Sequence, residues 1–563
     1  MAVSGRSSVC EDRRWDVLSA AAMLFVSSIM VLTVDDYGFT YDEQYHYTYG
    51  ENVLNWFLTL GADESALGHN HSYGVGYDLT HALLVRLLPF SPIDTAHYLC
   101  VAVALLGLLG TWNLARWLGG SLAGFLGLAF LVSSSVYYGQ QFNNPKDIPF
   151  AAGYIWGLYY AVRVASEPST APKRFWVAVS LAFAAAMSVR LVGGVVVGYA
   201  LLALLFSLLE KWRRDVLPSW RELGACVFKL AVAVVGALAL VVAVWPWLHS
   251  YPFVERSSGR SSFGGLVKYK GYDAPTLLHG EMVPSQDAPW DYIPTYFLLQ
   301  LGEVLLLFTG LGVVALGVLW VNAFRHRTEW PSGATVVGVA VLFPPAFAII
   351  NGSTVYNGLR HFLFIIPPLA CLAAFGAVWA WRAWPARAAL GGAGVGWKVG
   401  SWLPRGRYVI GAVLFFGLLE QVYSSIQLHP QQQVYFNRAS GGVKAAIGDY
   451  VTEYYGSTYK EVSRTFSEEL WRQQPHRYLN QSYAVSGCGD GMFFQYNLPE
   501  NFHFMWRRKA RSADYYMTYV RDNCHRHHPR APIVHRLVKQ DATLALVRDM
   551  GALRHKRAGQ RKR

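Results

Sequence analysis

The first three quarters of the chain alternate between long apolar runs and short polar connections. Apolar runs of roughly 20 residues, the length that crosses the hydrocarbon core of a bilayer, recur about eleven times. This pattern predicts an α-helical polytopic membrane protein with about eleven transmembrane helices, although 175–209 can also be read as one broken helix. The runs lie near 16–34, 96–115, 119–138, 149–165, 175–189, 191–209, 224–248, 293–321, 334–350, 362–381 and 408–427.

The last quarter of the chain has a different pattern. Alternating or β-branched stretches, YAVSGC, ADYYMTYV and IVHRLVKQDATLALV, lie between helical ones, which indicates a small α/β domain. We therefore predict a transmembrane domain at 1–427, a soluble domain outside the cytoplasm at 428–553, and a disordered basic tail at 554–563. The transmembrane domain is expected to carry outer loops at 35–95, 139–148, 249–291 and 351–361.

The sequence predicts a distinct structure for two of these loops. The segment 72–90 in the first loop has helical apolar spacing with a polar face, which predicts an amphipathic helix on the membrane surface. The loop at 249–291 is rich in Gly, Ser and Pro and is expected to be mobile.

Composition supports the membrane assignment and adds an orientation. The chain is 53% hydrophobic and 15% charged, which is atypical of a soluble protein. Lys and Arg gather in the N-terminal segment and in every second connection, so the N-terminus should be cytoplasmic. Acidic residues precede the first run and no small-residue cleavage site follows it, so we expect it to remain as an anchor. The net charge of +13 is spread over these loops, which argues against a nucleic-acid partner.

The cysteines do not form a disulfide scaffold or a metal motif of the CxxC type. Cys100, Cys226 and Cys371 lie in apolar runs, where cysteine acts as a small packing residue. Cys488 and Cys524 both fall in the soluble region, where a disulfide between them is chemically allowed.

An acidic pair follows the first apolar run, in the stretch FTYDEQYHYTYGENV. Asp42 and Glu43 stand among tyrosines and His46 where the chain should leave the membrane. Carboxylates near an apolar boundary titrate abnormally and can serve as bases at neutral pH. Taken alone, such a pair is more often a solvated surface feature.

Cations and a third carboxylate occur in the other outer loops. Lys146 and Asp147 end the stretch GQQFNNPKD, and Arg190 lies between two apolar runs. Arg360 and His361 end the stretch NGSTVYNGLRH. Helix capping and anchoring at the membrane interface are the alternative explanations for these residues. If the loops converge, the acids could position a nucleophile and the cations could hold a phosphate.

Several of these stretches together resemble a known family. They are YDEQYHYTYGENV, FNNPKDIPFAAGYIW, SVRLVGG, PWDYIPTYFLL, YNGLRHFLFIIPPL and the segment 434–461. The chain resembles bacterial membrane glycosyltransferases of family 39, which include protein O-mannosyltransferases and lipid A aminoarabinose transferases. The resemblance runs through most of the chain and implies the C-type glycosyltransferase fold.

The resemblance also implies a substrate class and roles for some residues. Family members transfer a sugar from a polyprenyl-phosphate donor to an acceptor outside the cytoplasm. Asp42 corresponds to the acidic residue thought to activate the acceptor, with Glu43 beside it, and Asp147 matches the second acidic position. Lys146, Arg190, Arg360 and His361 are candidates for the donor phosphate on charge and location alone. No DxD metal motif is present. Because some relatives bind a metal, the sequence leaves open whether a divalent ion binds here.

The sequence therefore predicts an inverting glycosyltransferase in the inner or plasma membrane of a bacterium, surrounded by membrane lipids. Its donor would be a polyprenyl-phosphate sugar and its acceptor a protein, lipid or glycan. Two alternatives use the same cations: a transporter or flippase for a lipid-linked glycan, and a non-catalytic protein that only binds one. A transporter should carry ionisable groups near mid-bilayer, whereas here they gather at one face.

Overall fold

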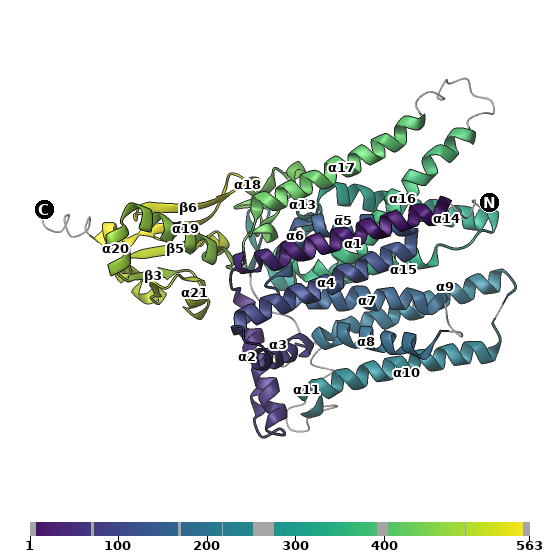
Figure 1. Cartoon of the computed structure of the whole chain (residues 1–563), viewed down its shortest axis with the longest axis horizontal. Helices are drawn as coiled ribbons and strands as arrows, with labels where there is room; N and C mark the ends of the chain where they lie inside the picture. Colours follow the sequence, from purple (N-terminus) through teal and green to yellow (C-terminus); the bar gives the residue numbers. More distant parts are fainter. Residues whose placement is uncertain are drawn as a thin grey trace.

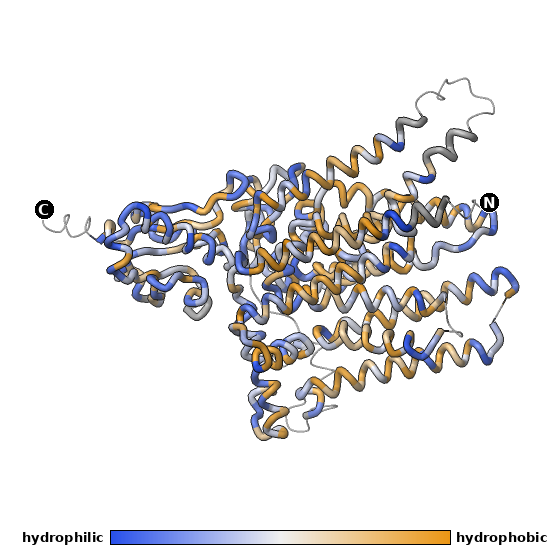
Figure 2. Tube along the Cα trace, viewed as in Figure 1, coloured by the Kyte–Doolittle hydropathy of each residue, from blue (hydrophilic) through white to orange (hydrophobic). Residues whose placement is uncertain are grey.

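The computed structural model describes residues 7–68, 73–166, 171–216, 218–250, 275–390, 403–489 and 491–554. It consists of a bundle of long helices with a small sheet-containing domain at one end (Figure 1). The tube in Figure 2 is mainly hydrophobic along the bundle and more hydrophilic in the connections and the end domain. The predicted fold class, a helical membrane protein with a small C-terminal α/β domain, is confirmed.

Long helices follow most of the predicted apolar runs. Within the described residues, eight helices are long and apolar enough to cross a membrane, or nine if the bent pair α5–α6 is one span. The prediction of about eleven spans therefore stays a prediction. The bundle helices are α1 (Ser7–Thr33), α4 (Pro92–Gly119), α5 (Ser121–Ser133), α6 (Ser135–Tyr138), α7 (Asp147–Ser166), α8 (Lys173–Val189), α9 (Val195–Arg213), α10 (Trp220–Val244), α14 (Glu303–His326), α15 (Ser332–Ile350), α16 (Ile366–Leu390) and α17 (Leu403–Leu428).

Two breaks in the bundle have clear causes. The run 293–321 is divided into α13 (Tyr292–Gln300) and α14. Gly302 lies in the break, where the backbone passes so close to Gln421 that a Cβ atom would lie 2.3 Å from it, so any other residue there would displace the Gln421 side chain. The run 175–209 is divided into α8 and α9 by an extended residue, Arg190, and a short 3-10 turn, Leu191–Gly194. An arginine is costly in an apolar helix, so a break that turns it toward an anionic partner stabilises this arrangement.

The first outer loop is largely helical. The acidic pair lies in the first turn of α2 (Tyr41–Leu58). The amphipathic helix predicted in 72–90 is α3 (Gly76–Leu87). Both helices lie across the end of the bundle that faces the C-terminal domain (Figure 1).

The second outer segment is only partly described. A short hairpin is formed by β1 (Pro275–Leu278) and β2 (Glu281–Pro284), and α11 (Pro246–Ser250) precedes it. The mobile loop predicted at 249–291 lies partly outside the described residues, since 251–274 are not among them. Most of the basic tail, 555–563, is also outside them.

The C-terminal domain is built on a five-stranded sheet with strand order β4-β3-β5-β7-β6. Strand β3 is parallel to β4 and β5, while β7 is antiparallel to β5 and β6. Each alternating stretch of the sequence forms a strand or hairpin here, as predicted. The elements are α18 (Gly442–Ala446), α19 (Thr458–Gln473), α20 (Pro475–Asn480), β3 (Tyr483–Gly487), α21 (Gly491–Asn497), β4 (Phe502–Phe504), β5 (Tyr515–Tyr519), β6 (Ile533–Lys539) and β7 (Ala542–Asp549).

A disulfide closes part of this domain. Cys488 and Cys524 are bonded, with Cα atoms 6.1 Å apart. Cys100, Cys226 and Cys371 are free and buried in the bundle, as expected of packing residues.

The N-terminus and the C-terminal domain lie at opposite ends of the bundle (Figure 1). The basic loops predict that the C-terminal domain is outside the cytoplasm. In a chain whose unpaired cysteines are replaced by serine, Leu60→Cys and Asn480→Cys should react with an impermeant maleimide in intact cells. Val216→Cys, an exposed position in a basic connection, should react only after permeabilisation. The reverse result would invert the orientation.

Candidate active site

Four segments that are far apart in sequence meet where the bundle faces the C-terminal domain. They are the start of α2, the turn before α7, the break between α8 and α9, and the 3-10 turn Gly358–Ile365 before α16. Together they bring five of the predicted residues into contact, which we call the charge cluster. Its members are Asp42, Lys146, Asp147, Arg190 and Arg360.

Arg360 is the centre of the charge cluster. Its Nη2 donates to Asp42 Oδ2, and its Nε donates to Asp147 Oδ2 at 3.1 Å. Lys146 Nζ donates to the same Asp42 oxygen at 3.1 Å. Arg190 Nη2 donates to the other oxygen of Asp147, Oδ1. Arg360 therefore joins the two carboxylates, and each carboxylate also binds a second cation.

The local sequence explains how Asp147 is held. Asn144 Oδ1 accepts hydrogen bonds from the backbone N–H groups of Lys146 and Asp147, at 3.2 and 2.8 Å. Asn144 Nδ2 donates to Asp147 Oδ2 at 3.1 Å. This capping turn satisfies backbone donors at the start of α7, and the helix dipole favours a carboxylate there. Lys146 and Asp147 therefore belong to the capped start of α7, and both are also members of the charge cluster.

The charge cluster is mostly buried and is not neutral. The side chains of Asp147, Arg360 and Lys146 are 4, 5 and 8% exposed, and that of Asp42 is 18% exposed. Three cations face two carboxylates, so the five side chains carry a formal excess of one positive charge. An excess charge in a desolvated place is unfavourable unless an anion joins it. The arrangement favours the binding of an anion.

Glu43 points away from Asp42 although the two are adjacent in sequence. Glu43 Oε2 accepts from the backbone N–H of Thr40 at 2.6 Å in a capping box. Its Oε1 accepts from the hydroxyl of Tyr47 and lies 2.8 Å from His97 Nε2 on α4. Glu43 therefore fixes the start of α2 against α4.

His361, also predicted for the site, follows Arg360 on the 3-10 turn. Its ring packs edge-on against Tyr356, with ring centroids 4.5 Å apart. Within the described residues, no hydrogen bond joins it to the five side chains of the charge cluster.

Sequence reasoning missed two tyrosines that cover the charge cluster. The rings of Tyr454 and Tyr455 lie 5.7 and 5.0 Å from the guanidinium carbon of Arg360. The Tyr455 carbonyl accepts from the backbone N–H of Tyr41 at 3.1 Å, next to Asp42. The aromatic tract TEYYGSTY was visible in the sequence, but nothing in it indicated that it folds back onto the bundle.

Glu453 holds this tyrosine segment in place. Its carboxylate accepts from the backbone N–H groups of Tyr455 and Gly456, at 2.9 and 2.8 Å, and from the Thr458 hydroxyl at 3.0 Å. Burial raises the pKa of the Glu453 carboxyl, while these hydrogen bonds act to lower it. The C-terminal region thus contributes residues to the site.

A second missed feature is a buried pair one helical turn beyond Asp42. His46 Nδ1 lies 3.0 Å from Asp78 Oδ2, which links α2 to α3. The His46 ring also contacts Tyr73, whose ring faces Lys146 Nζ at 5.0 Å. These contacts hold α2 and Lys146 in a fixed relation.

An apolar groove of about 440 Å³ runs along the bundle between α3, α4, α7 and α8. Gly76, Tyr77 and Thr80 of α3 line it at one end, and Val103, Trp156 and Leu181 are among the residues along it. It also includes Pro149 and Val189, which come just after Asp147 and just before Arg190 in the sequence. The groove therefore connects the apolar face of the bundle with the segments that carry the charge cluster.

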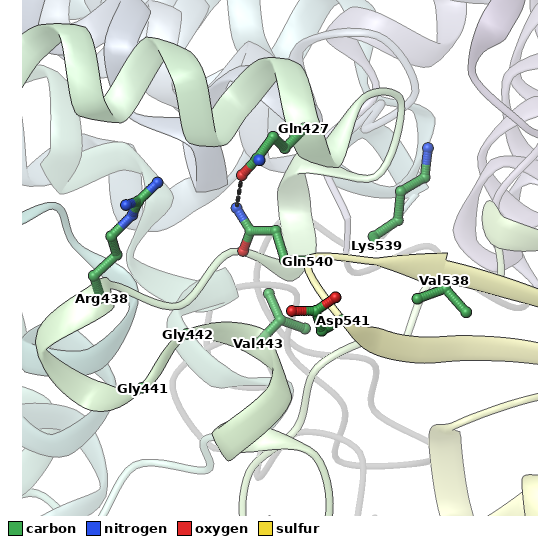
Figure 3. Close-up of a pocket in the computed structure, with 9 residues that line it drawn as sticks. All are labelled: Gln427, Arg438, Gly441, Gly442, Val443, Val538, Lys539, Gln540 and Asp541. Atoms are coloured by element: carbon green, nitrogen blue, oxygen red, sulfur yellow. Dashed lines mark hydrogen bonds between the residues drawn. The ribbon is translucent and has the colours of Figure 1, made fainter.

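A larger pocket, of about 590 Å³, has none of the predicted site residues in its lining, which Figure 3 shows. It is formed where Gln427 of α17 meets the turn between β6 and β7, and Gln540 of that turn donates to Gln427 at 3.4 Å. Its cations are already paired: Arg438 with Glu420 at 2.7 Å and Lys539 with Glu461 at 2.6 Å. This pocket is part of the contact between the bundle and the C-terminal domain.

In the part of the chain that the structure describes, one group of side chains has its ligand atoms close enough together to hold a metal ion. Cys488, Cys524 and His527 have ligand atoms within 4.8 Å of one another, but the two sulfurs are joined in the disulfide. In the charge cluster, the carboxylates of Asp42 and Asp147 form ion pairs with cationic side chains.

Comparison with known proteins found similarity in structure only. No family model matches the chain, and no curated protein matches it in sequence. ArnT from Cupriavidus metallidurans in the apo state is 14% identical with a TM-score of 0.48, covering 95% of this chain and 98% of that one. The Archaeoglobus fulgidus oligosaccharyltransferase is 12% identical with a TM-score of 0.44, covering 87% and 65%. Arabinofuranosyltransferase AftD from Mycobacteria is 11% identical with a TM-score of 0.41, covering 98% and 40%.

These solved structures are membrane glycosyltransferases of the C-type fold, the class that the sequence motifs indicated. At such low identities and TM-scores, we transfer neither a residue's role nor a substrate from them.

Proposed function

We propose that this protein is a membrane glycosyltransferase that takes a sugar from a polyprenyl-phosphate donor and transfers it to an acceptor outside the cytoplasm. The observation that carries the proposal is the buried excess of positive charge beside an apolar groove. A polyprenyl-phosphate sugar is an anion attached to a long apolar chain, so both features match one molecule. Membership of family 39 and the extracytoplasmic position of the site belong to this proposal.

The phosphate is expected to bind to Lys146, Arg190 and Arg360. Guanidinium groups present parallel donors that suit phosphate oxygens, and lysine adds a point charge. Each of the three now binds a carboxylate, and a phosphate would compete with Asp42 and Asp147 for the same donors. His361, beside Arg360, is the further candidate for a contact with the phosphate.

The lipid chain is expected to lie in the groove between α3, α4, α7 and α8. Its walls are apolar, so a polyprenyl chain can move from the surrounding lipid into the groove and gain van der Waals contacts with the side chains. Because Asp147 and Arg190 adjoin groove residues in the sequence, a chain in the groove would place its phosphate near the charge cluster.

The reaction would be a single displacement with inversion. Asp42 accepts the proton of the acceptor, whose oxygen or nitrogen forms the new bond to the anomeric carbon. The bond from that carbon to the phosphate oxygen breaks, and the electron pair leaves with the polyprenyl phosphate. The cations stabilise the charge that develops on the phosphate. Glu43 would act indirectly, by holding the first turn of α2.

The alternative of a transporter or flippase is less well supported. Transported ions and substrates are usually held by charged groups near mid-bilayer. Here the five charged residues meet at the end of the bundle that faces the C-terminal domain. A protein that only binds the glycolipid would need the cations but not Asp42, so loss of transfer in an Asp42 variant with intact binding separates the two cases.

The direct test uses mass spectrometry of glycolipids and glycoproteins from cells with and without this gene. A glycan that disappears with the protein identifies the sugar and acceptor. Purified protein should then release polyprenyl phosphate from the matching donor only when that acceptor is present. Translocation of the donor across vesicles without release would instead support a flippase.

Blocking the groove should reduce transfer. Ala185 lines the groove and is exposed, so Ala185→Trp fills space without disturbing packed side chains. The indole would displace part of the donor chain from the groove and remove its van der Waals contacts with the groove walls, which weakens donor binding. We expect a raised KM for the polyprenyl-phosphate sugar in a detergent assay.

The matched control is Ala346→Trp. Ala346 is exposed in another apolar groove of about 420 Å³, between α14 and α15. This variant should keep the wild-type KM. Equal effects of the two tryptophans would remove the groove beside α8 from the proposal.

A further inference from the structure

The hydroxyl of Tyr455 is buried and has no hydrogen-bond partner in the part of the chain that the structure describes. The residue is 3% exposed, and its hydroxyl makes no hydrogen bond to any described residue. The great majority of buried hydroxyls in proteins are hydrogen-bonded, because an unmade bond costs free energy. An unpaired donor beside a cluster with excess positive charge therefore indicates a missing acceptor.

The position of Tyr455 is well defined. Its ring packs against Arg360, its carbonyl accepts from the N–H of Tyr41, and its own N–H donates to Glu453. These three contacts fix the backbone and the ring on the charge cluster. The neighbouring Tyr454 differs, because its hydroxyl accepts from Gln140 at 2.8 Å. Of these two tyrosines, Tyr455 is the one whose hydroxyl is unused.

The hydroxyl of Tyr455 is protonated at neutral pH and can donate. Burial raises its pKa well above the usual value, although the positive charge of Arg360 acts to lower it. Cationic neighbours offer it no acceptor lone pair.

We propose that the Tyr455 hydroxyl donates a hydrogen bond to a phosphate oxygen of the polyprenyl-phosphate donor, which makes the C-terminal region part of the substrate site. This inference rests on the proposed function and adds a residue to it. As the bond from the anomeric carbon to the phosphate oxygen breaks, the phosphate changes from a monoanion to a dianion. Tyr455 keeps its proton throughout, and the proton of the acceptor goes to Asp42. Its hydrogen bond strengthens as the charge on the phosphate grows.

The test compares a lipid phosphate with the matching lipid alcohol. Tyr455→Phe keeps the ring over Arg360 and removes only the unused hydroxyl. We expect binding of farnesyl phosphate to weaken roughly ten- to a hundredfold, the range for a hydrogen bond to a charged group, while binding of farnesol is unchanged. Thermal unfolding of the ligand-free protein should not shift downward, because no protein hydrogen bond is lost.

Tyr137→Phe is the control. The Tyr137 hydroxyl is also buried without a partner among the described residues, and it lies near Gly107 in the bundle. Its loss should leave the binding of both lipids unchanged.

The outcomes separate this inference from the function it rests on. If the wild-type protein binds farnesyl phosphate no better than farnesol, the phosphate site itself is wrong. If the wild type prefers the phosphate and Tyr455→Phe keeps the full preference, the phosphate site stands and the role of Tyr455 is overturned.

Discussion

Asp42→Asn should lower sugar transfer by about two to four orders of magnitude, the range typical of losing a general base. The amide keeps the shape of the side chain but cannot accept the proton of the acceptor. Binding of a lipid phosphate should be retained or strengthened, because Lys146 and Arg360 lose an anionic partner and become available to the phosphate. The measurements are turnover of the purified protein and titration with farnesyl phosphate.

Two other aspartates serve as comparisons. Asp16→Asn breaks an ion pair with Arg116, which lies in the last turn of α4 and is 2.8 Å away, and should keep full transfer. Asp147 is more deeply buried than Asp42 and binds two arginines, so Asp147→Asn should lower stability as well as activity. Near-full transfer by Asp42→Asn would show that the catalytic assignment is wrong and make Asp147 the next candidate base.

Arg360→Met should affect both folding and binding. It leaves Asp42 and Asp147 without their shared partner, and breaking a buried pair in this way costs about 3–5 kcal/mol of stability. Binding of farnesyl phosphate should fall by at least roughly tenfold, since a charge-assisted hydrogen bond is lost. Thermal unfolding in detergent and lipid titration measure the two effects.

Arg360→Lys separates charge from geometry. A lysine keeps the charge, but its single nitrogen does not reproduce the planar fork that joins the two carboxylates. We expect intermediate stability and weakened binding. Arg438→Lys is the control, because Arg438 forms a more exposed pair with Glu420 in the pocket of Figure 3 and should change stability by less than about 1 kcal/mol. Wild-type binding by Arg360→Met would exclude Arg360 from the phosphate site.

The separation of Asp42 from Glu43 shows what a local pattern misses. Read as a loop, the two carboxylates form one acidic pair. In α2, successive side chains point about 100° apart, so Asp42 reaches Arg360 while Glu43 reaches His97. Expecting a helix after Thr40, from its capping box with Glu43, would have separated them in advance.

The sequence by itself determined the features that depend on local composition and spacing. Apolar runs of membrane length predicted the helical bundle, alternating residues predicted the strands after 428, and charges in apolar surroundings singled out Asp42, Lys146, Asp147, Arg190 and Arg360. The predictions of the bundle and the strands are confirmed, because burying apolar area lowers the free energy in any fold. The roles of the five charged residues stay predictions.

Only the tertiary structure decided which of these residues meet. Arg360 lies 318 positions from Asp42 and 213 from Asp147, yet it binds both. Tyr455 reaches the same place from the C-terminal region, and the groove is formed by α3, α4, α7 and α8 together. Such contacts depend on how the helices pack and where the chain returns, and no periodicity in the sequence encodes them.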